Sequence, residues 1–321
     1  MYRQIRLAIA TLIFSCTLLW VAAPIAAVEG WEQAPASGKP DRTETIAKPG
    51  QVRSCIERWV DELSRHKEYA EWKKADFRLY PLGPGSHSWV AILERDGREI
   101  GYLVAAATAE GEWILMEYGT GEYPLFSLNT LHRALMQHGL IPDSWTVGHL
   151  ENEPSLVLER SYEPPFMAVW KVHTERGVFV FDAKTGEVYP PESANEGDQG
   201  AQPAQARPDR RHAIRLSGDL AEIRTELFDP FHHLFWVRDR EPAPPYDAER
   251  IMNHLKAGLR CVYTVRIMDG SVTLPFAVTG IQRWGTNPPA VMLDHYGPRT
   301  FSYTVLAEYG DFHLQSGQHQ P

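Results

Sequence analysis

The sequence contains very little cysteine, no cluster of like charge and only one long apolar run. Its 321 residues include three cysteines, Cys16, Cys55 and Cys261, far fewer than a disulfide-rich scaffold requires. Basic residues are outnumbered by acidic ones, 32 to 41, and are interleaved with them, so nothing predicts nucleic-acid binding. The apolar fraction of 43% predicts a folded protein held together by apolar cores. Cys55 and Cys261 could form one disulfide or remain free thiols.

Motifs for common cofactors and metals are also missing. There is no phosphate-binding loop, no dinucleotide fingerprint, no Gly-x-Ser-x-Gly elbow, and no His-Glu-x-x-His or Cys-x-x-Cys spacing. His232 and His233 are adjacent, and adjacent residues on a strand point to opposite faces. We therefore predict no cofactor and no metal site.

The one long apolar run lies at the N-terminus. Arginines precede the apolar residues Leu7–Ala23, and the small residues Ala26 and Ala27 follow, which is typical of a secretory signal peptide. We expect residues 1–27 to be a signal peptide cleaved after Ala27, which predicts a secreted or extracytoplasmic protein. The alternative is an uncleaved anchor, because the run reaches the lower limit of ~17 residues for a membrane-spanning helix. Membrane contact is expected only in that case.

Composition divides the remaining chain into segments. Residues 28–49 are rich in proline, glycine and charge, which predicts a flexible leader. Three α+β units are expected at 50–141, 142–191 and 213–316, in which small antiparallel sheets pack against helices. Residues 192–212 contain glutamine, alanine, proline and charge, so we interpret them as an exposed linker.

Apolar periodicity predicts the elements of the first unit. A capping-box spacing at Ser54 and an apolar face predict a helix to roughly Trp72. An Asp-Gly hairpin signal then separates two strands, a third strand follows, and Ser127–Gly139 has helical spacing. The three strands are expected at Trp89–Glu94, Ile100–Thr108 and Trp113–Tyr118.

The third unit has the same mixed pattern. Leu220, Ile223 and Leu227 predict one helix, and Asp247 is expected to cap another. Four strands follow, at Cys261–Ile267, Phe276–Arg283, Ala290–Leu293 and Phe301–Tyr309.

Two related phrases occur in the first and second units. Val178–Tyr189 contains Thr185-Gly186-Glu187, and Trp113–Pro124 contains Thr120-Gly121-Glu122, each after an apolar strand. This correspondence suggests an internal duplication. We interpret Asp182, Thr185 and Gly186 as turn-forming residues.

The strands around the second phrase resemble a known module. Ala168–Val172 followed by Val178–Val188, read as VFVFDAKTGEV, is similar to the end of a PepSY-type domain. This family occurs in the propeptides of secreted proteases and in envelope proteins. The resemblance implies an extracytoplasmic unit that binds or inhibits a protease.

The third unit resembles the second half of papain-like cysteine peptidases of the bacteriocin-processing type. The similar residues are Thr273–Ile281 and Ala290–Gly297. In the family a catalytic histidine opens the first of these strands, whereas this chain has Leu274 or Pro275 there, and neither can transfer a proton. The resemblance therefore implies a degenerate peptidase half-domain.

Three residues are weak catalytic candidates. Cys55 is expected in the first turn of a helix, where the helix dipole would lower the pKa of a thiol. Asp294 and His295 are adjacent at a strand end, so we interpret Asp294 as fixing a turn through Gly297 and His295 as half-buried.

The sequence leaves three functional hypotheses. The first is a non-enzymatic protein that binds an extracellular peptide or protein, for example by strand addition at a sheet edge, and modulates a protease. The second is a divergent extracellular cysteine peptidase that uses Cys55. The third is a structural envelope protein.

Overall fold

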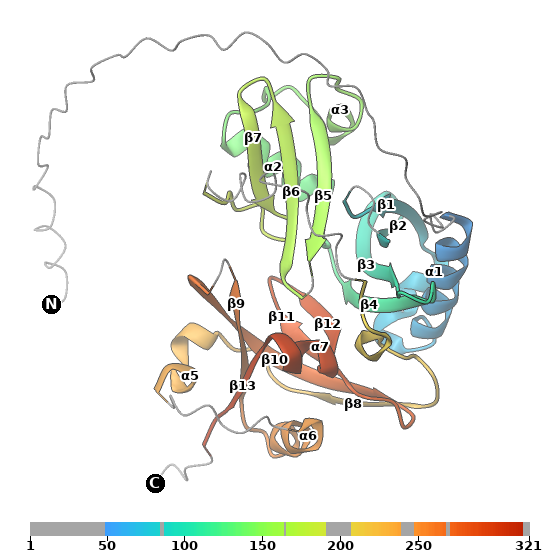
Figure 1. The fold of residues 1–321 in the computed structure, drawn as a ribbon, viewed down its shortest axis with the longest axis vertical. Helices are drawn as coiled ribbons and strands as arrows, with labels where there is room; N and C mark the ends of the chain where they lie inside the picture. Colours follow the sequence, from blue (N-terminus) through green and yellow to red (C-terminus); the bar gives the residue numbers. More distant parts are fainter. Residues whose placement is uncertain are drawn as a thin grey trace, which may run out of the picture. The chain divides into compact units, whose positions relative to one another are not determined.

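An antiparallel sheet of ten strands runs through most of the protein, and a second antiparallel sheet has three strands (Figure 1). The computed structural model describes residues 49–83, 87–163, 165–190, 207–238, 247–267 and 270–316. The predicted signal peptide, nearly all of the predicted leader and most of the predicted linker lie outside these ranges. Among the described residues, no helix is long and apolar enough to span a bilayer.

The large sheet combines strands from the N-terminal half of the chain with strands from its C-terminal part. The strands follow one another as β1-β2-β3-β4-β12-β11-β10-β9-β13, and β8 pairs with the remaining edge of β10. The bounds of these strands are β1 (Asp76–Pro81), β2 (Ser88–Arg95), β3 (Arg98–Ala107), β4 (Trp113–Thr120), β8 (Leu220–Arg224), β9 (Cys261–Ile267), β10 (Val272–Trp284), β11 (Ala290–Asp294), β12 (Pro298–Ser302) and β13 (Gly310–Leu314). The small sheet contains β5 (Val157–Glu163), β6 (Met167–Thr174) and β7 (Gly177–Asp182).

Helices cover both sheets. The α-helices are α1 (Pro49–Leu63), α2 (Leu128–Gln137), α3 (Val147–Leu150), α5 (Phe235–Arg238), α6 (Ala248–Lys256) and α7 (Tyr303–Tyr309), and the 3-10 helices are η1 (Lys67–Lys74), η2 (Arg210–His212) and η3 (Pro230–His232). The predicted capping at Asp247 is confirmed, because its side chain accepts a hydrogen bond from Arg250 N. The helix predicted from Ser127 is present as α2, and the Ser127 side chain caps it by accepting from Thr130 N.

The predicted α+β class is confirmed, but the strands are not divided into small sheets as expected. The segments 50–141 and 213–316 contribute to one sheet, because β4 pairs with β12, with Tyr118 opposite Thr300 and Glu117 opposite Phe301. A sequence pattern shows that β4 is a strand, but it cannot show which distant strand pairs with its second edge.

Three predicted elements differ from the structure in type or extent. The expected helix at 220–227 is wrong, because Leu220–Arg224 is a strand that fills the free edge of β10. The expected strand Phe301–Tyr309 ends at Ser302, whose hydroxyl accepts from Thr304 N at 3.3 Å and caps α7. The first helix starts at Pro49 and ends at Leu63, so Ser54 lies inside it and donates to Gly50 O.

The end of the predicted linker is also ordered. Arg210–His212 form η2, and His212 is buried with its Nε2 2.9 Å from the Glu308 carboxylate. The composition of 192–212 predicted exposure for this residue. Its contact with α7, nearly a hundred residues later, has no local sequence signal.

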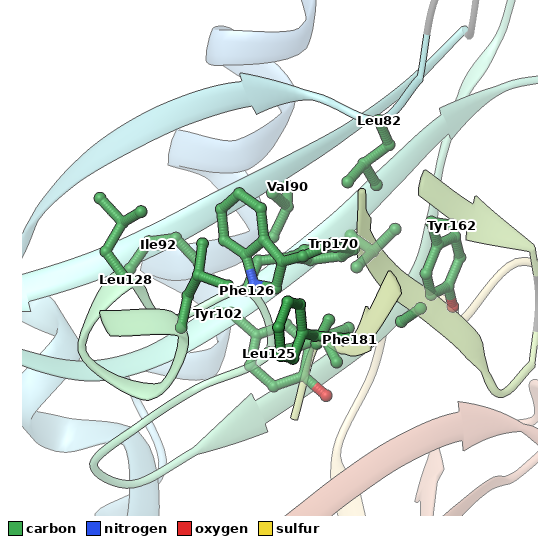
Figure 2. Packing of buried hydrophobic residues seen from close by; sticks show 14 of the residues in the cluster. Leu82, Val90, Ile92, Tyr102, Leu125, Phe126, Leu128, Tyr162, Trp170 and Phe181 are labelled. Carbon is green, nitrogen blue, oxygen red and sulfur yellow. The ribbon is translucent and has the colours of Figure 1, made fainter. Parts of the chain in front are cut away.

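Apolar side chains fill both faces of the large sheet. On one face, α1 packs Val52, Ile56 and Leu63 against β2 to β4. On the other face, the small sheet and α2 bury a second cluster, in which Phe126 and Trp170 meet edge to face with ring centroids 5.6 Å apart (Figure 2). These two layers hold β4, the strand that carries the groups described next.

Candidate functional site

A charged pair is buried where β4 meets β12. Arg299 Nε lies 2.7 Å from a Glu117 carboxylate oxygen, and the two side chains are 1% and 0% exposed. Tyr102 and Tyr162 donate their hydroxyl hydrogens to the same carboxylate. Burial alone would lower the pKa of Arg299, but Glu117 outweighs that effect and the pKa is raised. The arginine therefore remains charged.

The opposite face of the same junction carries a second hydrogen-bond network, centred on Tyr118 and Gln282. Tyr118 donates to Gln282 Oε1, and Gln282 Nε2 donates to Tyr69 at 3.1 Å and to Glu222 at 2.7 Å. Tyr118, Tyr69 and Gln282 are buried. Both faces of the short β4–β12 contact are thus fixed by hydrogen bonds, and neither network is open to a ligand.

The turn after β7 is held rigidly by Asp182. Its carboxylate accepts from Lys184 N at 2.8 Å and Thr185 N at 2.7 Å, and its carbonyl accepts from Gly186 N. Gly186 has φ +77 and lies so close to α2 that a Cβ would be 3.1 Å from Ala134. The turn-forming interpretation of Asp182, Thr185 and Gly186 is confirmed.

Two tyrosines near this turn have left-handed backbone conformations. Tyr123, in the loop between β4 and α2, has φ 56, and Tyr296, between β11 and β12, has φ 51. This conformation costs a residue with a side chain about 1–2 kcal/mol, so the surrounding structure must hold it in place. Both side chains are exposed, at 44% and 76%.

These segments enclose a cavity of 310 Å³. That volume is at the small end of the ~300–1,000 Å³ typical of ligand pockets. The two Thr-Gly-Glu phrases meet here, because the first contributes Glu122 and the second contributes Thr185 and Glu187. The lining residues are Glu122, Tyr123, Thr130, Arg133, Lys184, Thr185, Glu187 and Tyr296.

Lys184 is the unusual group in this cavity. Its side chain is buried, with the residue 8% exposed, and Nζ donates to Tyr123 O at 2.7 Å. Among the described residues, no carboxylate forms an ion pair with this ammonium. Burial lowers the pKa of Lys184 to about 8, Arg299 acts in the same direction, and Asp294 opposes it.

A second cavity, of 290 Å³, has a different charge arrangement. It lies beside α1 and β4, and its Arg210 is paired with Glu112 at 2.6 Å. The three arginines that line it, Arg58, Arg210 and Arg215, are all exposed to solvent, whereas Lys184 is buried and its ammonium has only a neutral carbonyl as partner. The Lys184 cavity is therefore the better candidate for binding an anionic ligand.

The predicted candidate Cys55 lies in a different place, on α1. Because the helix begins at Pro49, Cys55 lies beyond its first turn, and burial raises the pKa of this thiol. This corrects the expectation that the helix dipole lowers it. The Sγ atom is 3.7 Å from Arg58 Nη2. Both Cys55 and Cys261 are free thiols, and burial also raises the pKa of Cys261.

Asp294 and His295 have the separate roles expected for neighbouring residues. The Asp294 carboxylate accepts from Gly297 N at 3.2 Å and so fixes the turn before β12. His295 is partly buried, and its Nδ1 lies 3.0 Å from Arg299 Nη1. Burial, together with Arg299, lowers the pKa of His295 to about 3, so the imidazole is neutral and accepts this hydrogen bond.

The groups that the sequence did not single out are Glu117, Lys184, Arg299 and Tyr296. Glu117 is a carboxylate within an apolar strand, and such a residue signals a buried partner. Lys184 lies within the phrase that resembles the PepSY-type domain, but its burial depends on Tyr123 and Gly297, which are distant in sequence. Within the described part of the chain, no group of three His, Cys, Asp or Glu residues could hold a metal ion.

Neither a protein-family model nor a curated protein matches the chain.

Proposed function

We propose that this is a non-enzymatic protein that acts outside the cytoplasm, either secreted or associated with the envelope, and binds a peptide or protein. The N-terminal order of arginines, apolar run and small residues supports the location. The observation that carries the binding function is the Lys184 cavity. A buried ammonium with one neutral partner lines an open pocket and can bind a ligand without any chemical step.

The arrangement of the other titratable groups supports binding rather than catalysis. Glu117 and Arg299 are fully buried and satisfy each other, and His295 is used as an acceptor by Arg299. Cys55 has a raised pKa, whereas a nucleophilic cysteine needs a lowered one. Glu117, Arg299 and His295 thus stabilise the junction beside the cavity.

A random hexapeptide library tests this function. The purified protein would be incubated with the library and separated from unbound peptides by ultrafiltration, and the bound peptides would be identified by mass spectrometry. We expect a discrete set of intact peptides. Cleaved peptides that disappear with the Cys55→Ala variant would instead support the cysteine peptidase, and no retained peptide would contradict the binding function.

A further inference from the structure

Building on the proposed binding function, we propose that the Lys184 cavity binds the C-terminal carboxylate of a peptide. This inference rests on that function and adds the chemical class of the group that is recognised.

The charge of Lys184 is only partly satisfied by hydrogen bonds. An ammonium has three hydrogen-bond donors, and the structure gives this one a single acceptor, the Tyr123 carbonyl. A buried charge without a counterion is costly, and a bound carboxylate would offset that cost with a charge-assisted hydrogen bond. The Nζ atom also lies close to Gly297, since a Cβ built there would be only 3.5 Å from it. Nζ is thus placed between the loops that carry Tyr123 and Tyr296.

Two tyrosines form an aromatic wall of the cavity. Tyr123 and Tyr296 are exposed although their backbone conformations are unfavourable, and both line the cavity. Strained residues that the structure maintains at a pocket are typical of ligand contacts. The Arg133 guanidinium lies 5.0 Å from the Tyr123 ring centroid, which holds that ring in a defined position. The two rings provide an apolar surface for the last side chains of a peptide.

The charge and the size of the cavity also limit the ligand. Two acids, Glu122 and Glu187, and one base, Arg133, line it together with Lys184, so the acids disfavour a ligand with several negative charges while a single carboxylate can reach Lys184. The same two acids favour a basic side chain near the peptide terminus. A volume of 310 Å³ accommodates the end of a chain rather than a folded surface.

The test compares two random hexapeptide libraries, one with free C-terminal carboxylates and one with C-terminal amides. Each would be enriched on the immobilised full-length protein and read by mass spectrometry. We expect the acid library to be enriched at least ten-fold over the amide library, with lysine or arginine over-represented near the terminus. Lys184→Met should abolish the difference. Lys73→Met, at an exposed lysine on η1, is the matched control and should retain it.

The Tyr296→Ala variant covers the case in which Lys184→Met does not fold. Its side chain is exposed, so its truncation leaves the core intact and should still weaken retention of the acid library. Equal enrichment of both libraries would overturn the carboxylate inference while the binding function stands, and would point to strand addition at a sheet edge. Selection of Asp- or Glu-containing peptides from the amide library, lost in Lys184→Met, would assign the site to acidic side chains and also overturn the inference. Retention of neither library would overturn both proposals.

Discussion

Arg299 and Lys184 are both buried cations close to the start of β12, and the structure treats them in opposite ways. Arg299 has a carboxylate partner, two tyrosines that satisfy the same carboxylate, and a raised pKa. Lys184 has one carbonyl partner and a pKa lowered to about 8. Arg299 also disfavours the charge on Lys184. The difference separates a cation that stabilises the fold from one that is available to a ligand.

The largest expected effect is the loss of stability when Arg299, the paired cation, is replaced. Replacing Arg299 with methionine leaves Glu117 buried without a counterion, so we expect a loss of about 3–5 kcal/mol in the free energy of unfolding. Urea denaturation followed by tryptophan fluorescence measures this. The control is Arg98→Met, because Arg98 and Glu122 are largely exposed and 3.7 Å apart, and such a pair contributes less than about 1 kcal/mol. Equal losses in the two variants would show that the buried pair is not structural.

The next largest effect is the dependence of the free energy of unfolding on pH that Lys184 causes. The pKa of Lys184 is about 8 in the folded protein and ~10.4 when unfolded, so the unfolded chain binds more protons between these values. Stability should therefore rise with pH in this window, by about 2 kcal/mol between pH 7.5 and 9.5. The rise should be absent in Lys184→Met, so the difference between the two proteins isolates this lysine.

The charged groups that act on Lys184 are Arg299, Asp294, Glu117 and Asp182. The same urea experiments at several pH values provide the measurement. A pH profile that is identical in the wild type and in Lys184→Met would mean that the lysine is solvated as in the unfolded chain, and the contrast with Arg299 would disappear.

A smaller effect is expected on the face of the junction that carries Tyr118 and Gln282. Tyr118→Phe leaves Gln282 Oε1 buried without its donor, which should cost about 1–2 kcal/mol in thermal or urea unfolding. Tyr309→Phe, at a residue that is 46% exposed, should change stability by less than about 0.5 kcal/mol. A loss for Tyr118→Phe as large as that for Arg299→Met would contradict the distinction between the buried ion pair and the Tyr118–Gln282 hydrogen bond.

The smallest effect is on the rate at which the Cys55 thiol reacts with a maleimide. A thiolate at Cys55 would be a further charged group in a partly buried position, and its raised pKa makes this form scarce at pH 7.5. A maleimide should label Cys55 more slowly than a cysteine in a free peptide, and Cys261 should stay unlabelled until the protein unfolds. Rapid labelling of Cys55 in the folded protein would revive the cysteine peptidase hypothesis.

The sequence predicted local features well because their causes are local. The Asp96-Gly97 hairpin, the cap at Asp247 and the turn at Asp182 each depend on residues a few positions apart. The Lys184 cavity could not be predicted in this way, because its ammonium, its carbonyl partner and Tyr296 come from three distant segments. Even so, both Thr-Gly-Glu phrases noticed in the sequence contribute to its wall.

The pairing of β4 with β12 also constrains when the protein can finish folding. Glu117 and Arg299 are 182 positions apart, and the strands that carry them share only two register pairs. A growing chain that has reached β4 therefore has a sheet edge that gains only the isolated bridge between Leu115 and Ile214 before residues near 298–302 become available. Contacts over such long separations slow folding, and an unpaired edge promotes aggregation in the meantime. We expect the nascent chain to depend on a chaperone that binds unfolded chains, or on rapid completion of synthesis. The reason is that the strand that pairs with the second edge of β4 is synthesised near the end of the chain.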